Sequence, residues 1–87
     1  MPIDALWPSD KARALVTAHH TGGLVRTGRT ERGWRQEDLG TRLGCSTSTI
    51  SRLESRRLPS DLRLLRRAAE EVGVPTDVLA ASLSFGG

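Results

Sequence analysis

Residues 36–54 read QEDLGTRLGCSTSTISRLE, and this stretch decides the fold. Leu39 and Leu43 are four residues apart, so they fall on one face of a helix. Ile50 and Leu53 are three residues apart and share a face of a second helix in the same way. The stretch therefore predicts two short helices, each with one buried side.

The turn between these two helices is specified from both directions. Gly44 follows the first helix, where a helix end favours a residue that tolerates a positive φ. Ser46 precedes the second helix, where its hydroxyl can cap the first free amides. The outward side of the second helix carries Thr47, Ser48, Thr49, Ser51 and Arg52. Short hydroxyls and one guanidinium suit base edges and phosphates better than a protein core.

Length and composition narrow the class of protein. The chain has 87 residues, enough for one small domain with a modest core. Its single cysteine, Cys45, cannot form an intramolecular disulfide, and no Cys/His cluster has zinc-site spacing, so we expect neither metal nor cofactor. Without a membrane-length apolar run or a signal peptide, the chain is expected to be soluble and cytoplasmic. An enzyme is the least supported class, because no histidine lies near Cys45 in sequence to activate it.

Positive charge is concentrated around the central stretch. The net charge is +3, but residues 24–67 hold eleven arginines and five acidic residues, a net charge of +6. Residues 1–23 are neutral, and residues 68–87 carry a net charge of −3. A basic block of this kind favours a polyanion such as nucleic acid. On charge alone, a solvated arginine-rich surface is an equally good interpretation.

The rest of the chain also predicts helices. We expect an arm over residues 1–8 anchored by Leu6 and Trp7, helices over 11–20, 24–32, 62–72 and 77–83, and a short tail over 84–87. Thr21-Gly22-Gly23 is expected to end the helix over 11–20. No strand pattern is present, so the domain should be all-α, with five or six helices.

Four residues outside the central stretch stand out. Gly28 lies inside a predicted helix, which indicates a close approach of a neighbouring segment or a locally weak helix. Trp34 is expected to be core, beside the helix that begins at Gln36. His19 and His20 are expected to be structural residues at a helix C-terminus, because adjacent helical residues point in different directions and no third metal ligand lies nearby.

The run RTERGWRQEDLGTRLGCSTSTISRLE, residues 29–54, followed by LPSDLRLLRRAAEEVGVPTDVL, residues 58–79, resembles a known family. It is similar to the Cro/C1-type, or xenobiotic-response-element, helix-turn-helix domain of the lambda-repressor-like superfamily. The resemblance implies a compact DNA-binding domain over residues 24–83 with its motif at 36–54. Residues 1–23, an arm and an additional helix, look similar to the N-terminal extension of actinobacterial members, which often continue into a C-terminal sensory region.

The resemblance also implies roles for individual residues. Base contacts in the major groove fall to Thr47, Ser48 and Arg52. Phosphate contacts are expected from Gln36, Thr49, Arg56 and Arg57. Thr49 could touch a base instead, and Arg35 and Arg42 are weaker candidates. Arg29 and Glu54 match a buried ion pair of the family, so Arg29 is expected to be structural. Arg35 stands where relatives often carry a capping Ser or Thr, which predicts a less firm start of the helix from Gln36.

These observations predict a sequence-specific double-stranded DNA-binding transcriptional regulator, a repressor that occupies an operator. A single recognition helix reads few base pairs, so we expect a homodimer on DNA, with its interface on the last helix or the N-terminal extension. The alternative is a protein-interaction adaptor or an antitoxin-like module with the same fold. The acidic end of the chain and its Leu- and Val-rich last helices leave room for such an interaction surface.

Overall fold

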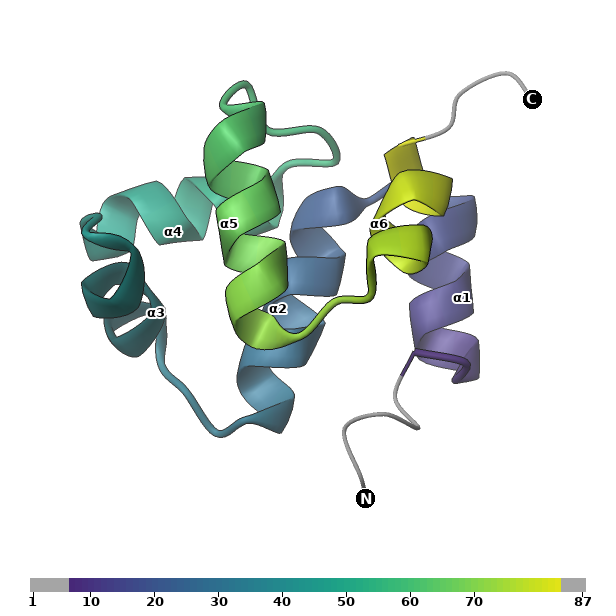
Figure 1. Cartoon of the computed structure of the whole chain (residues 1–87), viewed down its shortest axis with the longest axis horizontal. Helices are drawn as coiled ribbons and strands as arrows, with labels where there is room; N and C mark the ends of the chain where they lie inside the picture. Colours follow the sequence, from purple (N-terminus) through teal and green to yellow (C-terminus); the bar gives the residue numbers. More distant parts are fainter. Residues whose placement is uncertain (1–6, 84–87) are drawn as a thin grey trace.

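The computed structural model describes residues 7–83, and these form six α-helices and no strand (Figure 1). The helices are α1 (Asp10–Thr17), α2 (Thr21–Glu31), α3 (Gln36–Leu43), α4 (Thr47–Ser55), α5 (Leu62–Val72) and α6 (Thr76–Leu83). Helix α2 runs through the middle of the molecule. Helices α3 and α4 lie on one side of it and α1 and α6 on the other, while α5 crosses in front. The all-α prediction is confirmed.

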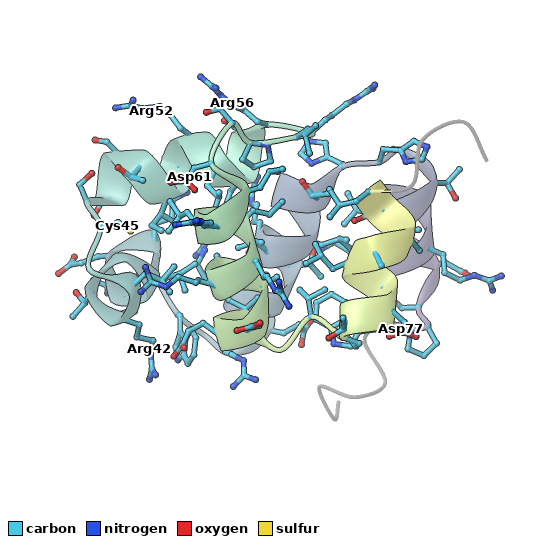
Figure 2. The ribbon with its side chains drawn as sticks, turned by 45° about the horizontal axis from the view of Figure 1, so that its top comes forward. Arg42, Cys45, Arg52, Arg56, Asp61 and Asp77 are labelled. Atoms are coloured by element: carbon cyan, nitrogen blue, oxygen red, sulfur yellow. The ribbon has the colours of Figure 1, made fainter. Side chains whose placement is uncertain are left out.

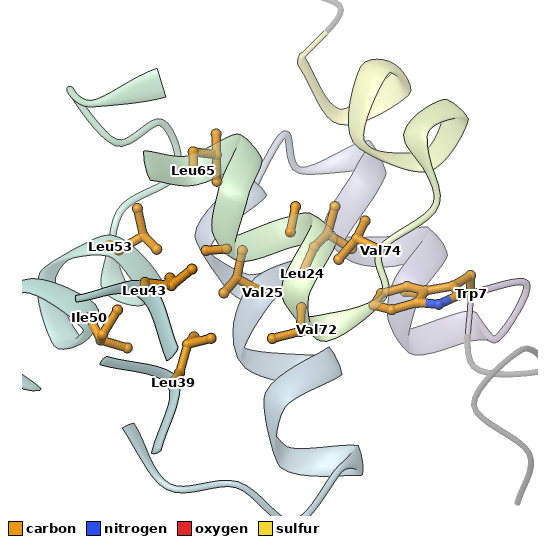
Figure 3. Packing of buried hydrophobic residues seen from close by; sticks show 13 residues of the cluster. Trp7, Leu24, Val25, Leu39, Leu43, Ile50, Leu53, Leu65, Val72 and Val74 are labelled. Carbon is orange, nitrogen blue, oxygen red and sulfur yellow. The ribbon is translucent and has the colours of Figure 1, made fainter. Parts of the chain in front are cut away.

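The core joins the two predicted helices of the motif to α2 and α5. Figure 3 shows side chains from α3 and α4 meeting those of the central helices. The fully buried large side chains include Leu24, Val25, Leu39, Ile50, Leu65 and Val72. Burying apolar surface stabilises the fold by about 25 cal/mol per Å². This burial is the main force that holds α4 against the rest of the domain.

Trp7 anchors the N-terminal end of the described chain. Its side chain is only 6% exposed and belongs to the same buried cluster as Val74, on the α1–α6 side of the molecule (Figure 3). This confirms the predicted anchoring role of Trp7, whereas Leu6 lies outside the described residues. Trp34 is half-buried against the core rather than enclosed by it.

The predicted chemistry of the turn between α3 and α4 is present, and α5 begins and ends in a similar way. Gly44 ends α3 with φ 73°, and Gly73 ends α5 with φ 84°, both in the left-handed region that glycine adopts without strain. The hydroxyl of Ser46 accepts a hydrogen bond from the Thr49 amide, and the Asp61 carboxylate accepts one from the Leu64 amide. Local sequence therefore sets the ends of the helices on both sides of the motif.

Gly28 lies where α5 approaches α2 closely, which is one of the two explanations predicted for a glycine at this position. A Cβ at this position would lie 2.8 Å from Val72 Cγ2 and 2.9 Å from the Val72 carbonyl oxygen. Glycine thus lets α2 and α5 pack closer than an alanine would permit.

The predicted end of the first helix was wrong. Thr21-Gly22-Gly23 does not terminate α1, which ends at Thr17, but forms the first turn of α2. His20 is the N-cap of α2, and its Nδ1 accepts a hydrogen bond of 2.8 Å from the Gly23 amide. His20 therefore has a structural role, but at a helix N-terminus and not at the expected C-terminus. His19, at φ 56°, places its Nδ1 3.1 Å from the Ser82 carbonyl oxygen of α6.

Candidate nucleic-acid interface

Helix α4 separates an apolar inner side from a polar outer side. Ile50 and Leu53 are buried against α2 and α3, which fixes the rotation of the helix about its axis. The outer side presents Thr47, Ser48, Ser51 and Arg52, all exposed. Within residues 7–83 the hydroxyls of Thr47 and Ser48 have no hydrogen-bond partner, so their donor and acceptor capacity is available to a ligand.

Thr49 differs from its two neighbours. It is half-buried, and its Oγ1 lies 2.9 Å from the Ser46 Oγ that caps α4. Its hydroxyl is therefore partly committed to the start of the helix. Among the candidate residues of α4, Thr47 and Ser48 are the ones whose hydroxyls are unengaged at the helix N-terminus.

Arg52 and Arg56 form a pair on one edge of the molecule. Both line a shallow depression of about 190 Å³ between α4 and the start of α5, together with Ser60. Figure 2 shows their side chains directed away from the protein on the same side. In the part of the chain that the structure describes, neither guanidinium forms an ion pair, so both remain available to an anion.

The backbone at Arg57 is held by the first residue of α2. The Arg57 carbonyl oxygen accepts two hydrogen bonds from Thr21, one of 2.9 Å from the amide and one of 2.6 Å from the hydroxyl. Beside it, a Cβ on Gly22 would collide with the carbonyl oxygens of Leu53 and Arg56. The N-terminus of α2 thus packs directly on the C-terminal end of α4 and positions the segment that carries Arg56 and Arg57.

Thr21 and Gly22 are residues that the sequence reasoning missed as contributors to the site. The signal was present, because Gly and Thr are also accepted at helix starts. A Gly-Gly pair is equally consistent with a helix end, and only the distant partner Arg57 separates the two interpretations.

A buried polar network supports α4 from behind. Arg29 donates to Glu54 through Nε (2.6 Å to Oε2) and through Nη2 (2.9 Å to Oε1). Its Nη1 donates to the Trp34 carbonyl oxygen at 2.7 Å. The side chains of Arg29 and Glu54 are 10% and 2% exposed, so neither contributes charge to the surface. The pair ties α2, the α2–α3 connection and α4 together.

Gln36, an expected phosphate ligand, also belongs to this network. Its Nε2 donates to Glu54 Oε1 at 3.2 Å, and the side chain is half-buried. The second hydrogen on Gln36 Nε2 is not used by this bond. The backbone N–H of Gln36, at the start of α3, also has no acceptor within the helix. The bond to Glu54 thus orients Gln36 without using all of its donors.

The start of α3 is capped in an unusual way. Arg35 occupies the N-cap position, where a guanidinium has no acceptor and cannot cap the helix. Instead the Asp38 carboxylate accepts a hydrogen bond of 2.7 Å from the Arg35 amide. Glu37 and Asp38 also place negative charge where the helix dipole favours it, which compensates for the missing side-chain cap.

Arg42 does not join the basic group of α4. Its guanidinium carbon lies 4.0 Å from the centre of the Trp34 ring, and its Nη1 lies 3.1 Å from Glu71 Oε1. In Figure 2 it projects from the edge opposite Arg52 and Arg56. The structure therefore separates Arg42 from the other candidate residues and gives its charge two partners within the chain.

Cys45 is half-buried beside the core, and its Sγ lies 3.7 Å from the Leu43 carbonyl oxygen. Over residues 7–83, no group of three or more His, Cys, Asp or Glu side chains is arranged to hold a metal ion. None of the helices in this range combines the length and apolar character needed to cross a bilayer.

The family comparison agrees with this geometry. A family model described as a helix-turn-helix domain matches residues 20–83, which include α2 to α6 and the whole motif. No curated protein and no solved structure matches the chain significantly. The match is consistent with the Cro/C1-type resemblance and indicates DNA binding by a regulator. The chain belongs to the helix-turn-helix domain family.

Proposed function

We propose that this protein is a sequence-specific double-stranded DNA-binding transcriptional regulator that acts as a repressor by occupying an operator. The observation that carries the proposal is the outer side of α4, with its exposed and unengaged Thr47, Ser48 and Arg52. A buried apolar side and the Arg29–Glu54 pair hold this helix in a fixed orientation. A rigid polar helix of this kind matches the way a recognition helix enters the major groove.

The first turn of α4 would meet the bases. Thr47 and Ser48 each offer a hydroxyl that can donate to or accept from a base edge, and such contacts discriminate weakly between bases. Arg52, one turn further along, can make two hydrogen bonds to guanine O6 and N7. We therefore assign most of any guanine preference to Arg52.

Phosphate contacts would flank the groove on both sides. On one side Gln36 would offer its backbone amide and its remaining side-chain donor, with Arg35 beside it. On the other side Arg56 and Arg57 follow α4 on the segment held by Thr21, and Thr49 would add a hydroxyl contact. Phosphate contacts of this type fix the register of the protein on DNA and make its affinity depend on salt.

A homodimer would supply the specificity that one helix lacks. One α4 reads only a few base pairs, whereas two copies related by a two-fold axis read two half-sites about one helical turn apart. The operator of such a dimer is expected to be palindromic or nearly so.

Selection of bound sequences from a random double-stranded DNA pool tests the proposal most directly. We expect an enriched motif with two-fold symmetry, and an affinity for it that falls steeply between low and high salt. A reporter gene preceded by that motif should be transcribed less when the protein is present. Failure to enrich any motif, with an affinity insensitive to salt, would favour the adaptor or antitoxin-like function instead.

The variant Arg13→Ala is a matched control in these assays. Arg13 is exposed on α1, outside the assigned contacts. Its replacement by Ala removes one positive charge, just as Arg52→Ala does. The enriched motif should be unchanged for Arg13→Ala and altered for Arg52→Ala.

A further inference from the structure

A second depression lies beside the C-terminal end of α4, on the side of α1 and α2. It has a volume of about 560 Å³, and its lining includes Lys11 of α1, Arg26 and Thr30 of α2, and Ser55 of α4. Helix α1 precedes the residues 20–83 that the family model matches, so the helix-turn-helix domain alone does not form this α1–α2 depression.

The charges around the α1–α2 depression are positive on balance. Lys11 and Arg26 are both exposed, and within residues 7–83 neither forms an ion pair. The one carboxylate of the lining belongs to Glu54, whose side chain is 2% exposed and binds Arg29. Because this negative charge is compensated inside the protein, the depression presents two cations to solvent.

The other polar side chains of the lining divide into two kinds. The hydroxyls of Thr27, Thr30 and Ser55 each donate a hydrogen bond to a carbonyl oxygen of their own helix, so they have no proton left for an anion. His20 accepts a backbone amide through Nδ1, so its neutral imidazole carries the proton on Nε2. The depression thus offers donors from two full positive charges and one imidazole, and this set suits an anion.

The α1–α2 depression adjoins the outer side of α4. Ser55 follows Ser48 by seven residues and Ser51 by four, so the three exposed hydroxyl positions share one side of the helix. Glu54, in the same lining, accepts a hydrogen bond from Gln36 Nε2, which places the depression on the Gln36 side of α4. A DNA strand in contact with Gln36 would therefore pass beside the depression.

We propose that Lys11 and Arg26 bind the sugar–phosphate backbone of double-stranded DNA outside the base pairs that α4 reads. Helix α1 thereby extends the nucleic-acid interface beyond the helix-turn-helix domain. This inference rests on the proposed function, because it adds a contact to the same DNA. A phosphate is the ligand that fits, since the guanidinium can bind two of its oxygens and the ammonium can neutralise its charge. The contact raises affinity and carries no sequence information.

The variants Lys11→Ala and Arg26→Ala test this contact against Arg13→Ala. Arg13 is exposed on α1 two residues after Lys11, about 200° around the helix, and does not line the depression. Fluorescence anisotropy should be measured on a duplex that extends about one helical turn beyond the selected motif. Lys11→Ala and Arg26→Ala should each bind about fivefold more weakly at low salt and lower the salt slope by about one unit.

The controls separate a phosphate contact from folding and from net charge. Arg13→Ala should change neither the affinity nor the slope, and Lys11→Arg should retain both, because it keeps the charge. All of the substituted side chains are exposed, so folded protein is expected in each case. Far-UV circular dichroism and thermal unfolding check this expectation.

A duplex with one uncharged methylphosphonate identifies the phosphate itself. The replacement, moved along the flanks of the motif, should weaken binding of the unmodified chain at one or two positions. At those positions it should not weaken Lys11→Ala further, because both partners of the contact are then absent. Arg13→Ala should respond to the methylphosphonate like the unmodified chain.

Lys11 is the only lysine in the chain, so lysine acetylation reports on this one side chain. Mass spectrometry of a proteolytic fragment that excludes the N-terminal amine follows the reaction. Saturating duplex should slow acetylation of Lys11 severalfold, and salt that dissociates the complex should restore the rate. An acetylation rate that is unchanged by DNA would contradict the contact.

The outcomes for the contact and for the proposed function are distinguishable. Equal affinity and equal salt slope for Lys11→Ala and Arg13→Ala would overturn the contact and leave the proposed function intact. A Lys11-dependent methylphosphonate effect without any selected motif would refute sequence-specific regulation and keep the contact. Absence of binding to every duplex would overturn both.

Discussion

Arg29 and Glu54 meet in a two-point ion pair, with Nε–Oε2 and Nη2–Oε1 distances of 2.6 and 2.9 Å, between the first and third helices of the matched domain. The two residues are 25 positions apart, and both are buried. Because Glu54 lies at the end of the helix proposed to read DNA, this pair connects the stability of the domain to the position of its reading surface.

Replacing Arg29 by Ala should destabilise the domain by about 3–5 kcal/mol, because Glu54 would remain buried without its partner. The free energy of unfolding, measured by urea denaturation, checks this value. Exchanging both residues for apolar ones, as in R29M/E54L, should cost much less. A loss below about 1 kcal/mol for R29A alone would contradict the buried pair.

Replacing Gly22 by Ala should destabilise the domain by about 1–3 kcal/mol, because the added Cβ meets backbone carbonyl oxygens that cannot move aside independently. The displaced Arg56–Arg57 segment should also weaken DNA binding at temperatures where the variant is folded. Gly33→Asn is the matched control, since Gly33 has open space around its Cα and Asn tolerates its φ of 73°. Gly22→Ala should therefore have a lower melting temperature and a lower DNA affinity than Gly33→Asn, as measured by thermal unfolding and DNA titration.

Replacing His20 by Ala should cost about 1 kcal/mol, because the Gly23 amide would lose its acceptor at the start of α2. His20→Asp should retain most of this stability, since a carboxylate caps helix N-termini well. Chemical denaturation of both variants measures the difference. Equal stability of His20→Ala and His20→Asp would show that the capping bond contributes nothing.

Arg52 and Arg56 should separate base reading from phosphate binding. Arg52→Ala should cost about 1–3 kcal/mol on the selected DNA site and less on random DNA, because it removes a contact to a base. Arg56→Ala should weaken binding to both DNAs alike and lower the salt dependence by about one unit in slope. Fluorescence anisotropy at several salt concentrations measures both quantities. Identical behaviour of the two variants would refute the division of roles.

Arg42→Ala should affect stability rather than DNA binding. It removes the cation–π contact with Trp34 and the ion pair with Glu71, at a cost of about 0.5–1 kcal/mol. The slope of DNA affinity against salt should stay the same, because Arg42 lies on the edge away from α4. A smaller dependence of DNA affinity on salt in Arg42→Ala would instead show that Arg42 contacts a phosphate, as the family resemblance suggested.

The sequence by itself determined the motif, because the interactions that build it are local. Leucine spacing sets the buried sides of α3 and α4, and Gly44 and Ser46 act within a few residues of their own positions. The caps of α4 and α5 were predictable for the same reason. The outward polar side of α4 then follows from the burial of Ile50 and Leu53. The pairing of Arg29 with Glu54 required a family resemblance, since no periodicity connects residues so far apart.

Only the tertiary structure decided the features that depend on distant partners. The Arg57 carbonyl makes Thr21 a helix start, Glu71 and Trp34 draw Arg42 away from α4, and Glu54 engages one donor of Gln36. Each side chain is locally compatible with more than one role. The role that it takes depends on which group from another helix lies within hydrogen-bond distance, and the packing of α2, α4 and α5 sets that distance.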